Sequence, residues 1–261
     1  MQASDLLPYL NDLPLSIWRC YDSVGSTNDI ALDWAQAGAP DMAMVVADNQ
    51  TAGRGRFRRH WVTNPGTALA VSLVLRPDGS ELPCLSHFSA LGAIAIQQAL
   101  EESLGLATLI KWPNDTLLAG RKTAGILIEN TWLGSQLQAL VMGIGLNIAP
   151  ESVPPADQLM FPATSLEGVL GHTIDRWAVL RSILLKLASW RLRLGSPEFL
   201  EVWEDHLAYK GEWVRISGAG QPDQIGQIKG LMPSGSLILV SQEGDEFKVD
   251  AGDVSLRTVD S

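Results

Sequence analysis

Residues 106–148, LATLIKWPNDTLLAGRKTAGILIENTWLGSQLQALVMGIGLNI, determine the predicted fold. The apolar run 106–111 predicts a strand that leads into the turn Trp-Pro-Asn-Asp. Residues 116–118 and 124–129 flank a turn around Gly120, which is typical of a β-hairpin. Residues 138–148 predict a further strand. The stretch therefore indicates several neighbouring strands of one sheet.

Sequence patterns on both sides of this stretch complete the predicted architecture. Apolar spacing predicts helices at 29–35, 87–104, 174–194 and 197–209, and strands at 42–47 and 67–75. Beyond Lys210-Gly211, short alternating runs separated by Gly, Pro and Asp predict a small all-β barrel or sandwich, at 213–217, 224–231, 236–241 and 247–249. We expect an α+β protein: a mixed sheet packed with helices over residues 1–209, followed by a β domain over 210–261.

The composition is that of a globular protein. Of 261 residues, 46% are hydrophobic and 18% are charged, which is far from the composition of disordered chains. The net charge of −10 argues against non-specific binding to DNA or to anionic membranes. The N-terminus has no pattern of a secretory signal, and no apolar run reaches about 18 residues. We expect a cytoplasmic protein without a membrane span.

A basic loop, residues 50–61 (QTAGRGRFRRHW), is the first candidate functional segment. It carries four arginines within six positions, in a chain with only 19 basic residues. Glycines between them permit close approach of the backbone to a ligand, and arginine binds phosphate or carboxylate groups in a bidentate manner. A solvated loop or a minor nucleic-acid contact is the alternative. We favour a site for a small polyanion, formed by Arg54, Arg56, Arg58 and Arg59 with Gly53 and Gly55.

Polar residues at the end of the 106–111 strand form a second candidate. Lys111, Asn114 and Asp115 supply a cation, an amide and a carboxylate, a set suited to a Mg²⁺–phosphate group. A turn with an Asx hydrogen bond explains them equally well. In the following hairpin, Lys122 could reach a ligand carboxylate, and Gly125 would let a strand pass close to a ligand.

Two further segments have both structural and functional interpretations. Ser26, Thr27 and Asn28 precede the helix at 29–35, so one of them could be a plain N-cap. In the strand at 138–148, glycines at 143 and 145 precede Asn147. Small residues at a spacing of two usually indicate close packing, here against a helix or a flat ligand.

Taken in order, these motifs resemble those of biotin protein ligases. The resemblance covers nearly the whole chain and implies a class II synthetase-like catalytic fold followed by an SH3-like β domain. It also implies an ATP-dependent ligase that converts biotin to biotinyl-5′-AMP and transfers it to a lysine of a biotin carboxyl carrier domain, such as that of acetyl-CoA carboxylase. The motifs that carry it are Ser26-Thr27-Asn28, Gly53-Arg54-Gly55-Arg56 with Trp61, residues 111–115, residues 125–129 and residues 143–147.

The resemblance implies roles for individual residues. Those expected to bind biotin are Ser26, Thr27, Asn28, Gln50, Arg54, Gly55, Arg56, Lys122 and Gly125. Those expected to bind ATP are Arg56, Arg59, Trp61, Lys111, Asn114, Asp115, Asn147 and Arg257. Catalysis would depend on Arg56, Lys111, Asp115 and Lys122, and Asp115 would hold Mg²⁺ through ATP.

The chain departs from the family pattern in two ways. The family usually has glycine where this chain has Arg58, and a positive φ there would strain an arginine. Some relatives act as repressors through an N-terminal DNA-binding domain, whereas only about 15 residues precede the catalytic region here. We therefore expect no DNA binding. A homodimer is compatible with the family.

Three alternatives remain. A lipoate or octanoate ligase has a similar fold, but the segments at 26–28 and 111–115 are of the biotin type. A biotin-binding sensor without turnover is a second alternative, and the substitution at Arg58 leaves room for it. A nucleic-acid-binding protein that uses the basic loop is disfavoured by the net charge.

Overall fold

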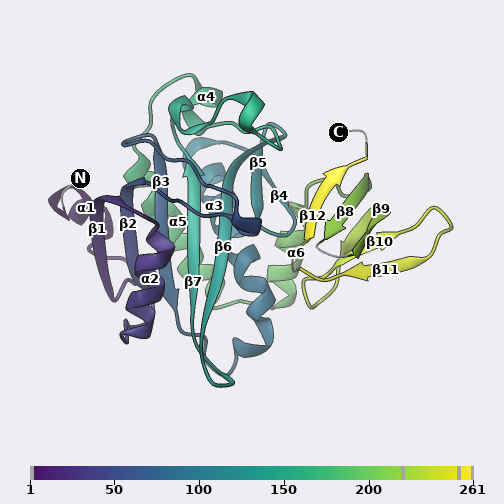
Figure 1. Cartoon of the computed structure of the whole chain (residues 1–261), viewed down its shortest axis with the longest axis horizontal. Helices are drawn as coiled ribbons and strands as arrows, with labels where there is room; N and C mark the ends of the chain where they lie inside the picture. Colours follow the sequence, from purple (N-terminus) through teal and green to yellow (C-terminus); the bar gives the residue numbers. More distant parts are fainter. Residues whose placement is uncertain (1–2, 219–220, 252–253, 260–261) are drawn as a thin grey trace.

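A seven-stranded mixed sheet forms the centre of the molecule (Figure 1). The structure, a computed structural model, describes residues 3–218, 221–251 and 254–259. The two strands at one edge pair in parallel, and all other neighbours are antiparallel. In spatial order the strands are β1 (Ile17–Val24), β2 (Ala43–Gln50), β3 (Ala68–Leu75), β7 (Gln136–Asn147), β6 (Arg121–Leu133), β5 (Asp115–Leu118) and β4 (Thr108–Lys111). The predicted mixed sheet is confirmed.

Half of this sheet comes from the stretch 106–148, as its sequence predicts. β4, β5, β6 and β7 follow one another as antiparallel neighbours, and the pairing places Gly125 opposite both Asp115 and Gly145. The hairpin of β6 and β7 is longer than predicted, because pairing continues to Leu133 opposite Gln136. Polar residues beyond 129 interrupt the apolar pattern there, but the backbone ladder does not depend on them.

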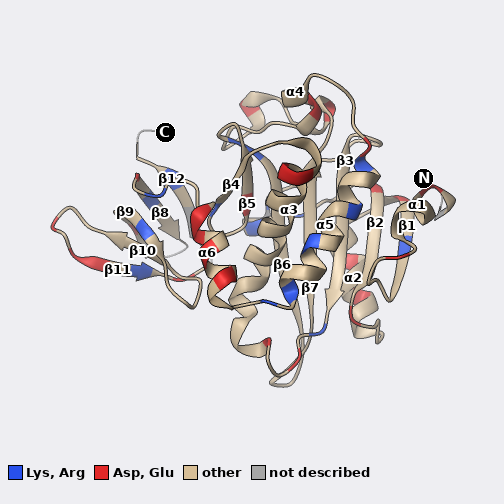
Figure 2. Ribbon diagram, turned by 180° about the vertical axis from the view of Figure 1, so that it is seen from behind, with Lys and Arg blue, Asp and Glu red and all other residues tan. Residues whose placement is uncertain are grey.

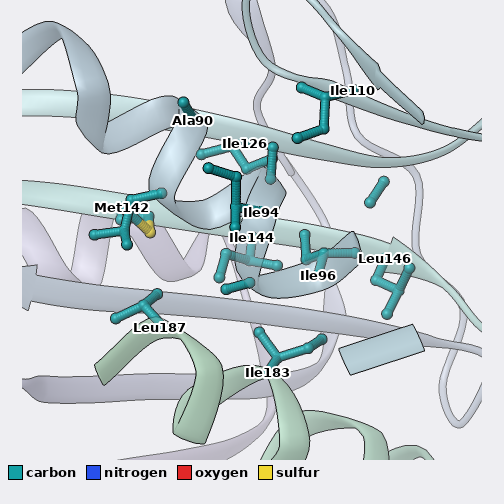
Figure 3. Close-up of a cluster of buried hydrophobic side chains, with 14 of the residues drawn as sticks. Ala90, Ile94, Ile96, Ile110, Ile126, Met142, Ile144, Leu146, Ile183 and Leu187 are labelled. Atoms are coloured by element: carbon teal, nitrogen blue, oxygen red, sulfur yellow. The ribbon is translucent and has the colours of Figure 1, made fainter. Parts of the chain in front are cut away.

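Helices cover both faces of the sheet (Figures 1 and 2). α2 (Thr27–Gln36) packs on one face against β2, β3, β6 and β7. α3 (Phe88–Leu104) and α5 (Arg176–Arg191) lie on the other face, where Ile94, Leu187 and Ile144 belong to one buried cluster (Figure 3). α3 is apolar on nearly all sides because it lies between the sheet and α5.

Several elements differ from the sequence-based prediction. α5 and α6 (Pro197–Asp205) are shorter than the apolar patterns at 174–194 and 197–209. The short helices α1 (Ala3–Leu10) and α4 (Leu166–Leu170) were not predicted, nor was β1. β1 is a half-exposed edge strand, so its sequence IWRCYDSV lacks a clean alternation of apolar and polar residues. The remaining short elements are 3₁₀ turns: η1 (Arg56–Arg58), η2 (Leu82–His87), η3 (Pro150–Ser152) and η4 (Ala156–Gln158).

A second sheet, fully antiparallel, follows α6 and agrees with the predicted SH3-like module. Its spatial order is β11 (Glu246–Val249), β10 (Leu237–Val240), β9 (Gln221–Leu231), β8 (Trp213–Gly218) and β12 (Val254–Thr258). Its buried residues, among them Val214, Leu239 and Leu256, belong to the same apolar cluster as the core of the large sheet. The boundary between residues 209 and 210 stays a prediction.

Polar bonds also join the two sheets, at the turn between β9 and β10. The indole Nε1 of Trp112 donates to the carbonyl of Gly235 at 3.1 Å. Ser86 Oγ donates to the Ser234 carbonyl at 2.7 Å, and His87 Nε2 lies 3.0 Å from the Pro233 carbonyl. The second sheet is thereby anchored to Trp112, in the segment that follows β4, and to the end of η2. No helix in the described ranges is long and apolar enough to cross a membrane.

The core described above predicts a clear contrast between two leucines of the α5 region. Leu187 is fully buried, whereas Leu192 is 89% exposed. Leu187→Ala should lower the free energy of unfolding by about 2–5 kcal/mol, because it leaves a cavity. Leu192→Ala should change it by less than about 0.5 kcal/mol. Urea denaturation of both variants measures this, and equal effects would contradict the core assignment.

Candidate functional site

A cavity of about 440 Å³ opens beside the N-terminus of α2 and the glycine-containing parts of β6 and β7. Every residue to which the resemblance assigns a binding or catalytic role lines it. They come from seven segments: Ser26, Thr27 and Asn28; Gln50; Arg54, Gly55, Arg56, Arg59 and Trp61; Lys111, Asn114 and Asp115; Lys122 and Gly125; Asn147; and Arg257. The structure thus brings together residues separated by more than 200 positions. Of the basic-loop residues expected to form a polyanion site, Gly53 is not among the lining residues, and the side chain of Arg58 lies outside the described residues.

The N-terminus of α2 forms one end of the cavity. Ser26 is the N-cap residue by position, but its side chain makes no capping hydrogen bond. The backbone N–H of Thr27 donates instead to Gln50 Oε1 at 2.8 Å, and the Thr27 hydroxyl lies 3.1 Å from the same oxygen. All three residues at 26–28 are buried. The simple N-cap interpretation therefore does not explain the Ser26 hydroxyl.

Two glycines of β7 allow other groups to lie directly on the sheet. A Cβ at Gly143 would be 2.2 Å from Asn28 Oδ1, and a Cβ at Gly145 would be 2.3 Å from Cε2 of Trp61. The close packing predicted for this strand is confirmed: a helix residue covers one glycine and a flat aromatic ring of the protein covers the other. An alanine at either position would displace the side chain that lies on it.

The basic loop is folded back on itself and tied to the rest of the site. Backbone bonds join Trp61 N–H to the Gly53 carbonyl at 2.9 Å, and Gly55 N–H to the Arg59 carbonyl at 2.8 Å. Arg54 pairs with Asp29 at 2.6 Å and Glu129 at 2.8 Å. In Figure 1 the segment after β2 crosses in front of β6. The loop is therefore held over the sheet.

Backbone strain in this loop falls on Phe57 and not on Arg58. Phe57 has φ 58° and ψ 34°, a left-handed conformation, within the 3₁₀ turn η1. Arg58 belongs to the same turn, and its side chain lies outside the described residues. The guanidinium groups of Arg56 and Arg59 lie 5.2 and 5.3 Å from the Phe57 ring.

Two residues after β4, Asn114 and Asp115, bind cationic side chains of the cavity. Lys122 Nζ lies 2.6 Å from Asp115 Oδ1. Asn114 accepts a hydrogen bond from Arg56 NH1 at 2.9 Å and donates to the Ile126 carbonyl at 2.8 Å. These bonds connect Asn114 to the basic loop and to β6, so a local Asx turn does not account for its side chain.

Lys111 differs from the other cations of the site because it is 3% exposed. Its ammonium group lies 3.6 Å from the ring centroid of Phe161. Burial disfavours the charged form, and together with the nearby Arg257 it lowers the pKa of Lys111 to about 7. A ligand that brings negative charge here would restore the ordinary preference for the ammonium form.

Asp115 is the only carboxylate among the described residues that line the cavity. The described part of the chain holds no group of three or more side chains arranged to hold a metal ion. Mg²⁺ is commonly held by one or two carboxylates together with substrate phosphates. The site therefore fits a cation that arrives with a nucleotide.

One wall of the cavity was not predicted from the sequence. Residues in the proline-containing segment after β7 line it, among them Met160 and Phe161. This segment is anchored to β6, where Lys122 N–H donates to the Pro162 carbonyl at 2.8 Å. Asn147 Nδ2 donates to the Thr164 carbonyl at 3.0 Å. The segment has no periodic pattern, so the aromatic side chain at 161 was the only available signal.

The second sheet also contributes to the cavity, as expected for Arg257. The Arg257 guanidinium lies 5.5 Å from the Phe161 ring, on which the Lys111 ammonium also lies. Burial and the neighbouring Arg59 lower the pKa of Arg257.

Glu129, which pairs with Arg54, was not predicted as a residue of the site, although a carboxylate at the end of the apolar run 125–129 was a visible signal.

Comparison with known proteins identifies the family. Residues 21–147 match the Biotin/lipoate A/B protein ligase family. A bifunctional ligase/repressor of Bacillus spizizenii is 36% identical over 238 residues, which is 90% of this chain and 72% of the relative. A biotin–[acetyl-CoA-carboxylase] ligase of Paracoccus denitrificans is 37% identical over 227 residues, 84% of this chain and 92% of the relative.

A solved structure supports the same assignment. The biotin protein ligase of Aquifex aeolicus in complex with biotin and ATP superposes with a TM-score of 0.81 at 28% identity, over 94% of this chain and all of that one. The matched length includes the second sheet as well as the cavity. The chain therefore belongs to the biotin/lipoate A/B protein ligase family and groups within it with the biotin protein ligases.

Proposed function

We propose that this protein is an ATP-dependent biotin–protein ligase. It activates biotin as biotinyl-5′-AMP, with release of pyrophosphate, and transfers the biotinyl group to a lysine of a carrier domain. The observation that carries the proposal is the convergence of Arg56, Lys111, Lys122 and Arg257 on one cavity, together with the ligase relatives.

This arrangement suits the chemistry of adenylation. The biotin carboxylate is itself the nucleophile and attacks the α-phosphorus of ATP, so no activated side-chain nucleophile is needed. Two anions must instead be brought together, and fixed cations lower the cost of that approach and of the charge that develops. A site rich in arginine and lysine without a catalytic triad meets this requirement.

Within the cavity we assign biotin to the end formed by α2 and β7. Ser26, Thr27 and Gln50 would bind its cyclic urea, beside Asn28, while Lys122 would hold its carboxylate. Gly125 supports this, because a Cβ there would be 3.2 Å from Lys122 Nζ and would crowd the ammonium group.

The nucleotide is assigned to the other end. Lys111, Asn114, Arg59 and Arg257 would contact it, with Asn147 and Trp61 at the boundary. Mg²⁺, when bound with ATP, would neutralise phosphate charge, and Asp115 is the residue that would hold it.

The basic loop would protect the mixed anhydride from water. Arg54, Gly55 and Arg56 lie in a segment already bonded to the rest of the cavity through Asp29, Glu129 and Asn114. Such a cover has a function here because biotinyl-5′-AMP is hydrolysed when exposed.

The acceptor is proposed to be a biotin carboxyl carrier domain of acetyl-CoA carboxylase, the substrate in the names of two relatives. We keep the expectation of a cytoplasmic enzyme that does not bind DNA, and of a domain boundary at residues 209/210, as predictions. A homodimer remains compatible with the proposal.

Biotin-dependent ATP–pyrophosphate exchange is the deciding experiment. We expect the purified protein to catalyse exchange with biotin, and not with lipoate or octanoate. If lipoate or octanoate supports pyrophosphate exchange and biotin does not, the protein is a lipoate or octanoate ligase and not a biotin ligase. Biotin binding without exchange would support the sensor alternative.

Substitution of Lys122 tests its proposed contact with the biotin carboxylate. Lys122→Ala should weaken biotin binding by about 1.5–3 kcal/mol, because a charge-assisted hydrogen bond is lost. Lys186 is a matched control, since both lysines are 27% exposed and each pairs with one carboxylate. Isothermal titration with biotin measures both variants. Unchanged affinity of Lys122→Ala would remove this residue from the biotin site.

The pKa of Lys111 predicts a pH dependence of ATP binding. A bound phosphate favours the ammonium form, so ATP binding takes up a proton when the free lysine is neutral. With a free-state pKa of about 7, affinity is full at lower pH and is lost as the pH rises. Above about pH 7 the ATP dissociation constant should increase by up to about tenfold per pH unit. Lys111→Arg stays charged and should give a flatter profile in titrations up to about pH 9; equal slopes would contradict the assignment.

A further inference from the structure

Ser72 does not line the cavity, yet it contacts two residues that do. It lies in the middle of β3 and is fully buried. Its hydroxyl donates to Thr27 Oγ1 at 2.8 Å and to Asn28 Oδ1 at 2.6 Å, so that its one hydrogen is shared between two acceptors. Ser72 is absent from the described lining residues, whereas Thr27 and Asn28 are among them. It therefore acts on a ligand through these two side chains.

A polar residue is unexpected at this position of β3. Every other residue of the strand is apolar. Val74, the next residue on the same face, belongs to an apolar cluster with Ala31 of α2. A buried hydroxyl costs free energy unless it is hydrogen-bonded, so an apolar residue would serve packing alone at lower cost. The serine thus indicates a requirement for a hydrogen bond at the N-terminus of α2.

The neighbouring strand makes room for this contact. Ser72 pairs with Gly143 of β7, where the missing Cβ lets the Asn28 amide lie on the backbone. The amide oxygen faces Ser72, and Asn28 Nδ2 donates to Glu129 Oε2 at 2.7 Å. The Asn28 amide is thereby held at both ends. A glycine on one strand and a serine on the next together keep it in one orientation.

Thr27 extends the same contact to Gln50. The Thr27 hydroxyl accepts from Ser72 and donates to Gln50 Oε1 at 3.1 Å. The backbone N–H of Thr27 donates to the same oxygen at 2.8 Å. With its oxygen held by two donors of Thr27, the Gln50 amide turns its NH₂ group away from that residue. The orientations of three side chains, one buried behind the cavity and two lining it, therefore depend on one another.

We propose that Ser72 is a positioning residue for biotin: its hydroxyl holds Thr27 and Asn28 on the sheet and, through Thr27, orients the Gln50 amide. The cyclic urea of biotin carries N–H donors and a carbonyl acceptor, and it binds most tightly to partners whose orientations are already fixed. The inference rests on the proposed binding of biotin at this end of the cavity. It adds a residue behind the site that preorganises it.

A double-mutant cycle between Ser72 and Thr27 is the test. Ser72→Ala should weaken biotin binding in isothermal titration by about tenfold, because Thr27 and Asn28 lose their donor. Ser72→Cys retains a weaker donor and should lie between Ser72→Ala and the unmodified protein. Thr27→Val should weaken binding by about tenfold or more. Since Ser72 acts through Thr27, Ser72→Ala should cost less than about threefold in the Thr27→Val background.

Ser236→Ala is the matched control. Ser236 is 4% exposed, its hydroxyl donates to Asp250 Oδ1 at 2.6 Å, and it is absent from the described lining residues. The substitution removes a buried hydroxyl and its hydrogen bond, as Ser72→Ala does, but in the second sheet. Biotin affinity should change by less than about twofold. Thermal unfolding compares the stability of both variants, and the KM for ATP at saturating biotin should stay within about twofold in Ser72→Ala.

Outcomes of this experiment separate the inference from the proposed function. If the unmodified protein does not bind biotin, the proposed function itself fails. If it binds biotin and Ser72→Ala binds with equal affinity, the positioning role of Ser72 is wrong. The role is also wrong if Ser72→Ala and Thr27→Val multiply their effects in the double variant, or if Ser236→Ala loses as much affinity as Ser72→Ala. A loss in Ser72→Ala that nearly disappears in the Thr27→Val background supports it.

Discussion

The close approach of two side chains to the backbone of β7 is the contact on which the site depends. Because residues 143 and 145 have no Cβ, the Asn28 amide and the Trp61 indole lie directly on the strand. α2 can therefore bring Ser26 and Thr27 to the cavity, and the basic loop can end over the sheet instead of in solvent. Side-chain bonds of the loop to Asp29, Glu129 and Asn114 add to this arrangement. A methyl group at either glycine would separate the layers that together form the cavity.

The protein compensates part of the positive charge of the cavity with its own carboxylates. Arg54 and Lys122 have carboxylate partners, and Arg56 bonds to the Asn114 amide. Lys111 is buried, and the face of the Phe161 ring lies 3.6 Å from its ammonium group. Burial and the nearby Arg257 lower its pKa. Ligand anions at this site would thus either exchange with internal carboxylates or charge a neutral lysine, and both routes couple binding to rearrangement of protons or ion pairs.

Much of this could be predicted from sequence, for definable reasons. The strands at 106–118 and the helix at 87–104 are apolar and bounded by glycine or turn residues, so their patterns are unambiguous. The predicted site residues were found because charged and small residues cluster in short motifs. β1 was missed because an edge strand need not alternate, and the wall around Phe161 because a loop has no period. The hydrogen-bond partners of Glu129 could not be predicted, because Arg54 and Asn28 are 75 and 101 residues away in the sequence.

The bond between Trp112 and Gly235 has a consequence for the architecture of the enzyme. Trp112 lies between Lys111 and the Asn114-Asp115 pair, so the five residues 111–115 both line the cavity and bind the β9–β10 turn of the second sheet. Arg257 reaches the cavity from that sheet, and the apolar core runs through both. The two modules are therefore not interchangeable. A chimera that joins this large sheet to the terminal module of a distant relative would alter the turn that binds the Trp112 indole, and it would shift the cation that Arg257 contributes to the cavity.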